Sequence, residues 1–190
     1  IEYLLTAAYR PDTLSFDNFL LNHSASYHVA VVVCWAEFWA EWYFFGHSWK
    51  RPGTVSLLGF AVTAAALFVR SLAMATAGSN FSHIIEDVKR EEHRLVTHGV
   101  YSHLRHPAYF GFFWFSVGTQ ILLLNPVGFV AYAWASWKFF ADRIPYEEDL
   151  LHDFFGREYA AYCGRTRIGI PGVASGGTRQ HTRKDARKDE

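Results

Sequence analysis

The stretch from Arg105 to Tyr109 combines residue types that can bind an anion at the start of a helix. Pro107 suits the first turn of a helix, and the sequence that follows it is apolar. Unpaired backbone N–H groups at a helix N-terminus attract a carboxylate. His106 and Tyr109 stand three residues apart, so they can add donors on one face of that helix. The alternative is that these side chains only anchor a helix at a membrane interface, and the motif alone leaves both interpretations open.

A second group of charged residues, Arg143, Glu147 and Glu148, follows a later apolar stretch. On one helix face, Arg143 and Glu147 can form a simple ion pair, because they stand four residues apart. Alternatively, Arg143 binds a substrate anion and Glu147 binds a cofactor amine. Pro145 lies between them, and a proline inside a helix removes one hydrogen bond and clashes with the preceding turn. We therefore expect one helix to end near Pro145 and another to begin.

Histidines are concentrated between residues 83 and 106, which raises the question of a metal site. The five in this stretch are His83, His93, His98, His103 and His106. The stretch contains no adjacent histidine pair and no cysteine, and only His103 and His106 are closely spaced. Interfacial histidines explain this pattern better than metal ligands, so we expect no metal. No Gly-x-Gly-x-x-Gly motif follows a strand pattern, so we expect no Rossmann domain.

The distribution of charge indicates a membrane protein. The 190 residues carry a formal net charge of zero and are 51% hydrophobic and 18% aromatic. This balance argues against a nucleic-acid binder, which would have a basic excess, and the aromatic content argues against disorder. Residues 18–85 contain only five charged side chains, and residues 107–137 contain none. A membrane-spanning helix needs about 20 apolar residues, and a soluble domain of this length could not bury several such helices.

We therefore expect an all-α, multi-span integral membrane bundle. The expected spans are residues 28–45, 54–77, 107–124 and 126–141, with a tight turn at Asn125-Pro126. With four spans, the polar segments 78–106 and 142–169 lie on the same side of the membrane. Their Lys and Arg content favours the cytoplasmic side, where the interspan segment and the C-terminal helix would form a pocket. The chain begins at Ile1, so we expect missing earlier spans, and we expect residues 172–190 to be a disordered tail.

These motifs, taken in order, resemble the isoprenylcysteine carboxyl methyltransferase family. The matching motifs are His93-Arg-Leu-Val96, Gly99-Val-Tyr101, Arg105-His-Pro-x-Tyr-x-Gly111, Gln120, Asn125-Pro126, Arg143-x-x-x-Glu147-Glu148 and Phe155-Gly-x-x-Tyr159-x-x-Tyr162. Upstream, residues 17–24 and 77–81 resemble the eukaryotic branch. The resemblance extends over residues 2–171, and it implies that residues 1–171 form a membrane-embedded methyltransferase core.

The resemblance implies transfer of a methyl group from S-adenosylmethionine to the C-terminal carboxylate of a prenylated cysteine. It implies a multi-pass protein of the endoplasmic reticulum membrane with its active site facing the cytosol. The implied partners are farnesylated or geranylgeranylated protein C-termini, such as those of small GTPases. The implied cofactor-binding residues are Glu86, His93, Arg94, Leu95, Val96, Tyr101, His106, Pro107, Ala108, Tyr109 and Glu147.

Two arginines are assigned to the substrate in the same way. Arg143 would face the substrate carboxylate, and Arg70 would line the route of the prenyl chain. For Arg70 the alternative is a side chain that extends to the membrane interface. Two other functions remain open: a phospholipid N-methyltransferase-like enzyme, whose substrate is an amine, and a membrane scaffold without catalytic activity.

Overall fold

The computed structural model describes residues 2–9, 11, 25–89, 91 and 93–176, and within them the chain is helical without strands. The prediction of a helical fold is confirmed for these residues. The α-helices are α1 (Glu2–Tyr9), α2 (Ala25–Phe45), α3 (Thr54–Ala77), α4 (Pro107–Leu123), α5 (Pro126–Phe155) and α6 (Arg157–Arg165). Two short 3-10 helices, η4 (Gly78–Asn80) and η5 (Gly99–Ser102), lie between α3 and α4. The segment 17–24 and most of the predicted tail, residues 177–190, lie outside the described residues.

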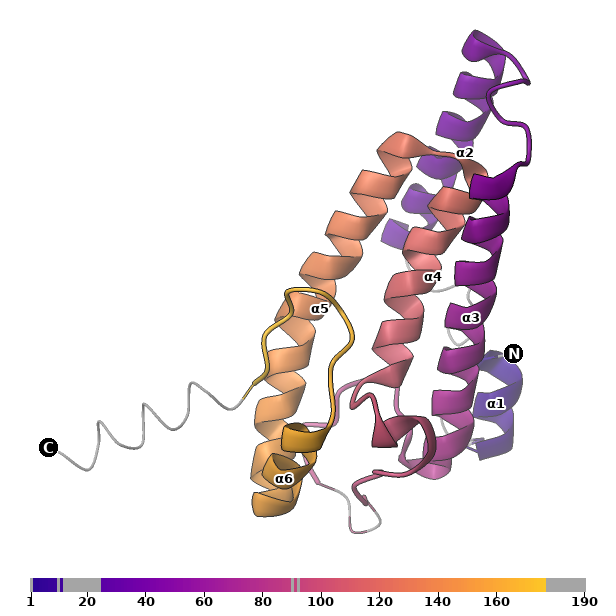
Figure 1. The fold of residues 1–190 in the computed structure, drawn as a ribbon. Coiled ribbons are helices and arrows are strands. Elements are labelled where there is room, and N and C mark those ends of the chain that lie inside the picture. Colours follow the sequence, from indigo (N-terminus) through magenta and orange to yellow (C-terminus); the bar gives the residue numbers. More distant parts are fainter. Residues whose placement is uncertain (1, 10, 12–24, 90, 92, 177–190) are drawn as a thin grey trace, which may run out of the picture.

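Helices α3, α4 and α5 form the body of the molecule (Figure 1). The most extensive contact is between α3 and α4, and α5 packs on α4. Helix α1 contacts α3, and α2 contacts α5. One end of the bundle holds the turn between α4 and α5, and the other end holds α6 and the segment that leads from α3 to α4 (Figure 1). The polar segments predicted to lie on one side therefore do lie at the same end.

The close contact between α3 and α4 depends on glycines. A Cβ atom added to Gly59 would lie 2.2 Å from the backbone nitrogen of Leu122, and one added to Gly111 would lie 2.7 Å from the backbone oxygen of Ala66. Small residues allow two backbones to approach in this way, which is how apolar helices associate without a hydrophobic driving force.

Replacing Gly59 with alanine is expected to destabilise the fold by about 3 kcal/mol, because the added methyl group must push the two backbones apart. The free energy of unfolding in detergent micelles measures the effect. Gly164→Ala in α6 is the matched control, since a Cβ atom there meets no atom within 4 Å. Equal stability of the two variants would contradict the close packing of α3 on α4.

Two charged side chains hold the turn between α4 and α5: Glu37 in α2, and Lys50 in the loop between α2 and α3. Lys50 Nζ donates to the Leu124 carbonyl oxygen at 2.7 Å and to Asn125 Oδ1 at 2.8 Å. The Glu37 carboxylate accepts the backbone N–H of Gly128 at 2.7 Å. A cation at the end of α4 and an anion at the start of α5 also match the two helix dipoles. These contacts explain why an otherwise apolar region retains a few charges.

Helix α5 continues through Pro145, so the prediction of a helix break there is wrong. Ile144 and Glu148, on either side of the proline, have no exposed surface. Tertiary contacts on this face hold the helix together despite the hydrogen bond that proline removes. As a result, Arg143 and Glu147 lie on one continuous helix.

Among the described helices, one stretch, Thr54–Asn80, is long and apolar enough to cross a membrane by length and composition. The other three expected spans coincide with helices that fall short of this measure for identifiable reasons. Helix α2 contains two glutamates, α4 has 17 residues, and α5 becomes charged from Lys138 onward. The number of membrane crossings therefore stays a prediction.

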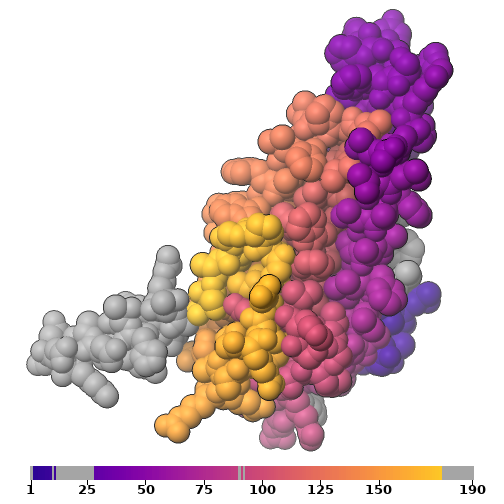
Figure 2. All heavy atoms as spheres, viewed as in Figure 1, coloured from indigo at the N-terminus to yellow at the C-terminus, as the bar shows by residue number. Residues whose placement is uncertain are grey.

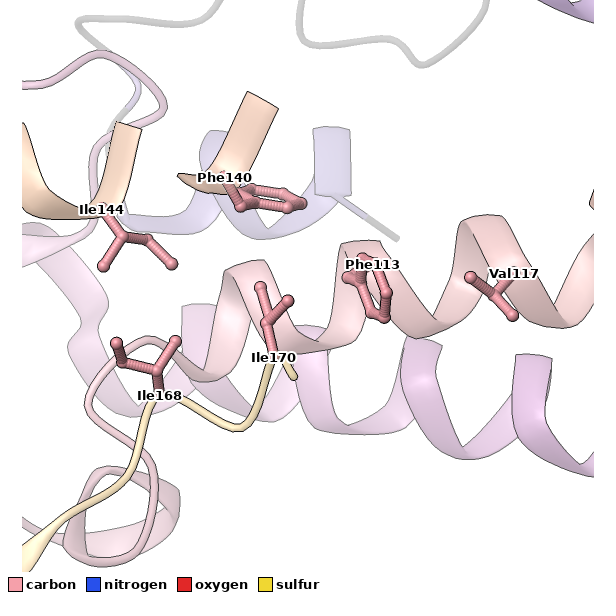
Figure 3. Packing of buried hydrophobic residues seen from close by; sticks show 6 residues of the cluster. All are labelled: Phe113, Val117, Phe140, Ile144, Ile168 and Ile170. Atoms are coloured by element: carbon pink, nitrogen blue, oxygen red, sulfur yellow. The ribbon is translucent and has the colours of Figure 1, made fainter. Parts of the chain in front are cut away.

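The segment after α6 completes the apolar core. It folds back along α5 and contributes two isoleucines to a cluster that also contains two residues of α4 and two of α5 (Figure 3). The cluster consists of Phe113, Val117, Phe140, Ile144, Ile168 and Ile170. Residues up to 176 thus belong to the folded body.

Candidate active site

A cavity lies at the end of the bundle where the segment between α3 and α4 meets α5 and α6. The space between its wall atoms, counted with its open mouth, is about 700 Å³. Ten of the eleven predicted cofactor-binding residues line it. They are His93, Arg94, Leu95, Val96, Tyr101, His106, Pro107, Ala108, Tyr109 and Glu147. Residues distant in the sequence are therefore brought together around one space.

Glu86 is the exception. It lines a smaller cavity of about 400 Å³, which shares Asn80, Ser82, His93, Glu147 and Leu151 with the main one. The two cavities adjoin, but the structure does not place Glu86 at the wall of the larger cavity.

Further residues of the wall were not predicted as site residues. They are Ala77, Asn80, Phe81, Ser82, Arg105, Leu151, Phe155, Tyr159 and Tyr162. Most of them belong to motifs that carried the family resemblance, so the signal was present in the sequence. Leu151 has no such signal, because only the helical continuation of α5 past Pro145 brings it to the cavity.

Two hydrogen bonds fix the loops that form the wall. The backbone N–H of Arg94 donates to Asn80 Oδ1 at 2.9 Å, and the Tyr162 hydroxyl donates to the carbonyl oxygen of Tyr101 at 2.7 Å. The His93 ring meets the Phe155 ring edge-on at 5.5 Å between centroids. This part of the wall is therefore aromatic and held in place by backbone contacts.

The Tyr109 hydroxyl connects Arg143 to Glu147. It accepts a hydrogen bond from Arg143 Nε at 2.9 Å and donates one to Glu147 Oε2 at 2.6 Å. Arg143 also donates from Nη2 to the carbonyl oxygen of His83 at 2.8 Å. The two charged residues are thus joined through a tyrosine rather than as the simple ion pair that their spacing allows, and the Arg143 side chain is only half-buried.

Arg70 occupies a different environment at the edge of the same site. Its guanidinium donates to both carboxylate oxygens of Glu2, at 2.5 and 2.9 Å, and to the carbonyl oxygen of Ala108 at 3.1 Å. Arg70 belongs to α3, is 9% exposed, and packs toward α1 and α4. The Arg70 side chain therefore packs inside the bundle rather than pointing outward from α3. Its contact with Ala108 places it directly behind the cavity wall.

Glu148 is fully buried and hydrogen-bonded through both oxygens. Oε1 accepts from Arg105 Nε at 2.5 Å and lies 3.0 Å from His106 Nε2. Oε2 accepts from the Ser175 hydroxyl at 2.6 Å and from the Gly176 backbone N–H at 2.7 Å. Burial raises the pKa of this carboxyl, but the partners, His106 foremost, outweigh burial and lower its pKa to about 2. Glu148 therefore stays ionised at neutral pH.

This low pKa predicts a specific dependence of stability on pH. In the unfolded chain a glutamate has a pKa of about 4.3, so the folded state gains roughly 3 kcal/mol from the ionised Glu148 at neutral pH. The gain is fully present above about pH 5 and is lost as the pH falls toward 2. The difference in unfolding free energy between the wild-type chain and Glu148→Gln should shrink as the pH falls from 5 toward 2. A difference that grows on acidification would contradict the assignment.

Comparisons with known proteins point to one family. A model of the isoprenylcysteine carboxyl methyltransferase (ICMT) family matches residues 57–153. A protein-S-isoprenylcysteine O-methyltransferase of Dictyostelium discoideum is 48% identical over 174 residues, which cover 90% of this chain and 72% of that protein. The Homo sapiens enzyme of the same name is 45% identical over 170 residues, which cover 90% of this chain and 60% of that enzyme.

A solved structure, described as the eukaryotic intramembrane Ras methyltransferase ICMT, superposes with a TM-score of 0.88 at 43% sequence identity. The match covers 92% of this chain and 62% of that one. This chain thus spans about three fifths of the human relative and of the solved structure. The family model, the similar relatives and the matching solved structure show that the chain belongs to the isoprenylcysteine carboxyl methyltransferase family.

Proposed function

We propose that this chain forms the catalytic core of an enzyme that methylates the C-terminal carboxylate of prenylated cysteine, with S-adenosylmethionine as methyl donor. The observation that carries the proposal is the cavity, because ten predicted cofactor-binding residues meet there beside Arg143 in a member of this family. The relatives named protein-S-isoprenylcysteine O-methyltransferase support the choice of substrate.

The wall of the cavity suits a zwitterionic nucleoside such as S-adenosylmethionine. Glu147 presents a carboxylate that can pair with the ammonium group, and the aromatic wall around His93 and Phe155 can hold a flat base. When bound, this cofactor supplies an electrophilic methyl group on a sulfonium. The proposed task of the protein residues is to hold and orient the two reactants.

Arg143 is the residue that we assign to the substrate carboxylate. A carboxylate with a pKa of about 3.5 is already ionised at neutral pH, so its reaction requires no general base. Arginine does not give up its proton, so it can grip an anion without protonating it. The bonds to Tyr109 and His83 use two of its five N–H donors, so others can reach a substrate. Alignment and exclusion of water then provide most of the rate enhancement.

The outer surface of α2 and α3 supports a membrane-embedded bundle. Large apolar side chains point away from the protein on both helices, and a soluble monomer rarely exposes so many together. Examples are Val29, Trp35, Trp39, Phe44, Leu57, Phe60 and Phe68. We propose that these faces contact lipid, that the prenyl chain reaches the cavity through a lateral opening between spans, and that Arg70 lines this route.

The positions of the basic residues support a cytosolic cavity in the endoplasmic reticulum membrane. The elements at the cavity end carry most of the basic residues of the described chain, whereas the loop between α2 and α3 at the other end carries Lys50 and Arg51. Those at the cavity end include Lys89, Arg94, Arg105, Arg143, Arg157 and Arg165. An excess of Lys and Arg marks the cytoplasmic side of a membrane protein. Prenylated C-termini of proteins such as small GTPases would reach the cavity from this side.

Equilibrium binding of S-adenosylhomocysteine to the chain in lipid nanodiscs tests this proposal. We expect saturable binding with one site per chain, because the product of the donor occupies the same cavity as the donor. A membrane scaffold would not bind S-adenosylhomocysteine. A titration that detects no binding of this ligand would therefore favour the scaffold alternative.

A further inference from the structure

The segment that follows α6, residues 166–176, is called here the C-terminal strap. It leaves α6 and lies over α4 and α5 (Figure 2). Ile168 and Ile170 are buried in the apolar core, and Trp137 Nε1 donates to the Pro171 carbonyl oxygen at 2.8 Å. The strap is therefore anchored along α5 before its last residues reach Glu148.

The end of the strap supplies half of the hydrogen bonds that Glu148 accepts. Oε2 is bound by Ser175 and the Gly176 backbone, while Oε1 is shared by Arg105 and His106. A buried carboxylate is stable only while its lone pairs are satisfied. Without Ser175 and Gly176, one oxygen of Glu148 would have to turn toward water.

His106 transmits the position of Glu148 to the cavity. Its imidazole is 5% exposed and stacks on Tyr109 with 5.5 Å between ring centroids and an interplanar angle of 5°. Tyr109 in turn connects Arg143 to Glu147. A continuous set of contacts thus runs from the strap through Glu148 and His106 to the residues at the cavity.

We propose that the end of the C-terminal strap, Ser175 and Gly176, positions the cofactor site by holding Glu148 and, through it, His106. This inference rests on the proposed function, since it concerns the cavity assigned to the cofactor. Glu148 acts as a positioning residue: its carboxylate does not line the cavity, but it fixes the orientation of a histidine that does.

Gly176 offers a way to disturb this contact from outside the cavity. A Cβ atom there would lie 2.5 Å from the Pro145 carbonyl oxygen and 2.7 Å from Glu148 Cβ, so alanine must lift the end of the strap away from α5. Ser175 allows a finer change, because alanine removes the hydroxyl and threonine keeps it.

The test compares Gly176→Ala with Gly164→Ala, a glycine in α6 whose Cβ would meet no atom within 4 Å. We expect Gly176→Ala to weaken S-adenosylhomocysteine binding about tenfold, the effect of disturbing one hydrogen bond to a charged group. Gly164→Ala should bind S-adenosylhomocysteine with the affinity of the wild-type chain. Hydrogen–deuterium exchange should become faster in Gly176→Ala only, and there at residues 172–176 rather than throughout the bundle.

A second pair of variants separates positioning from general stability. Ser175→Ala should weaken binding in the same direction, and Ser175→Thr should restore it, because threonine keeps the hydroxyl that reaches Glu148. Faster hydrogen–deuterium exchange of residues 172–176 in Gly176→Ala, with unchanged affinity for S-adenosylhomocysteine, would overturn the proposal. Unchanged exchange of these residues in Gly176→Ala would overturn it as well. If the unchanged chain binds no S-adenosylhomocysteine, the proposed function itself fails, and the role of the strap fails with it.

Discussion

Replacing Arg143 with alanine is expected to reduce kcat/KM for methylation of prenylated cysteine about a hundredfold or more, the usual result of removing one partner of a buried charge pair. The affinity for S-adenosylhomocysteine should fall much less, because the Arg143 guanidinium touches the cofactor cavity only through Tyr109. Initial rates at saturating donor, together with equilibrium binding of S-adenosylhomocysteine, measure the two effects separately.

The matched control for Arg143 is Arg157→Ala, which removes the same side chain from an exposed position in α6. It should leave both quantities unchanged. Arg143→Lys is expected to recover only part of the activity, since an ammonium cannot form the planar two-pronged contact of a guanidinium. An equal loss of substrate turnover and cofactor affinity in Arg143→Ala would show that the division of roles is wrong.

Replacing Glu147 with glutamine should have the opposite pattern. Glutamine keeps an oxygen that can accept the Tyr109 hydroxyl, but it removes the charge that pairs with the cofactor ammonium. We expect the dissociation constant for S-adenosylhomocysteine to rise by roughly thirtyfold, as for loss of a hydrogen bond between charged groups. Turnover at saturating donor should change little. Isothermal titration and initial rates at several donor concentrations measure the two effects.

Glu158→Gln is the control for this variant, because Glu158 is exposed in the first turn of α6. It carries the same chemical change outside the cavity and should bind the cofactor as the unchanged chain does. If Glu147→Gln binds S-adenosylhomocysteine as tightly as the wild-type chain, the Glu147 carboxylate does not contact the cofactor and is only a partner of Tyr109.

The sequence was sufficient to predict ten residues of the cavity wall, because they belong to short motifs. Pro107 begins α4 as expected, and the motif from Arg105 to Tyr109 does lie where a polar segment meets an apolar helix. Leu151 could not be found in this way. Its place at the cavity depends on α5 continuing through Pro145, and local proline rules predict the opposite.

Contacts between distant segments account for the other features that the sequence did not show. Glu148 was predicted only as part of a family motif, and no local pattern indicates that Ser175 and Gly176 bind it. Likewise, the ion pair of Arg70 with Glu2 joins α3 to α1 across 68 positions. Such pairings depend on how the helices pack, and charge patterns along one segment do not encode them.

Methyl transfer to two competing lipids tests the central claim most directly. The protein in nanodiscs is supplied with S-adenosylmethionine carrying a labelled methyl group, together with N-acetyl-S-farnesylcysteine and phosphatidylethanolamine. We predict label in a base-labile methyl ester of the farnesylcysteine, because Arg143 presents a cation to a carboxylate beside the cavity. Label found only on the amine of the phospholipid would contradict the account.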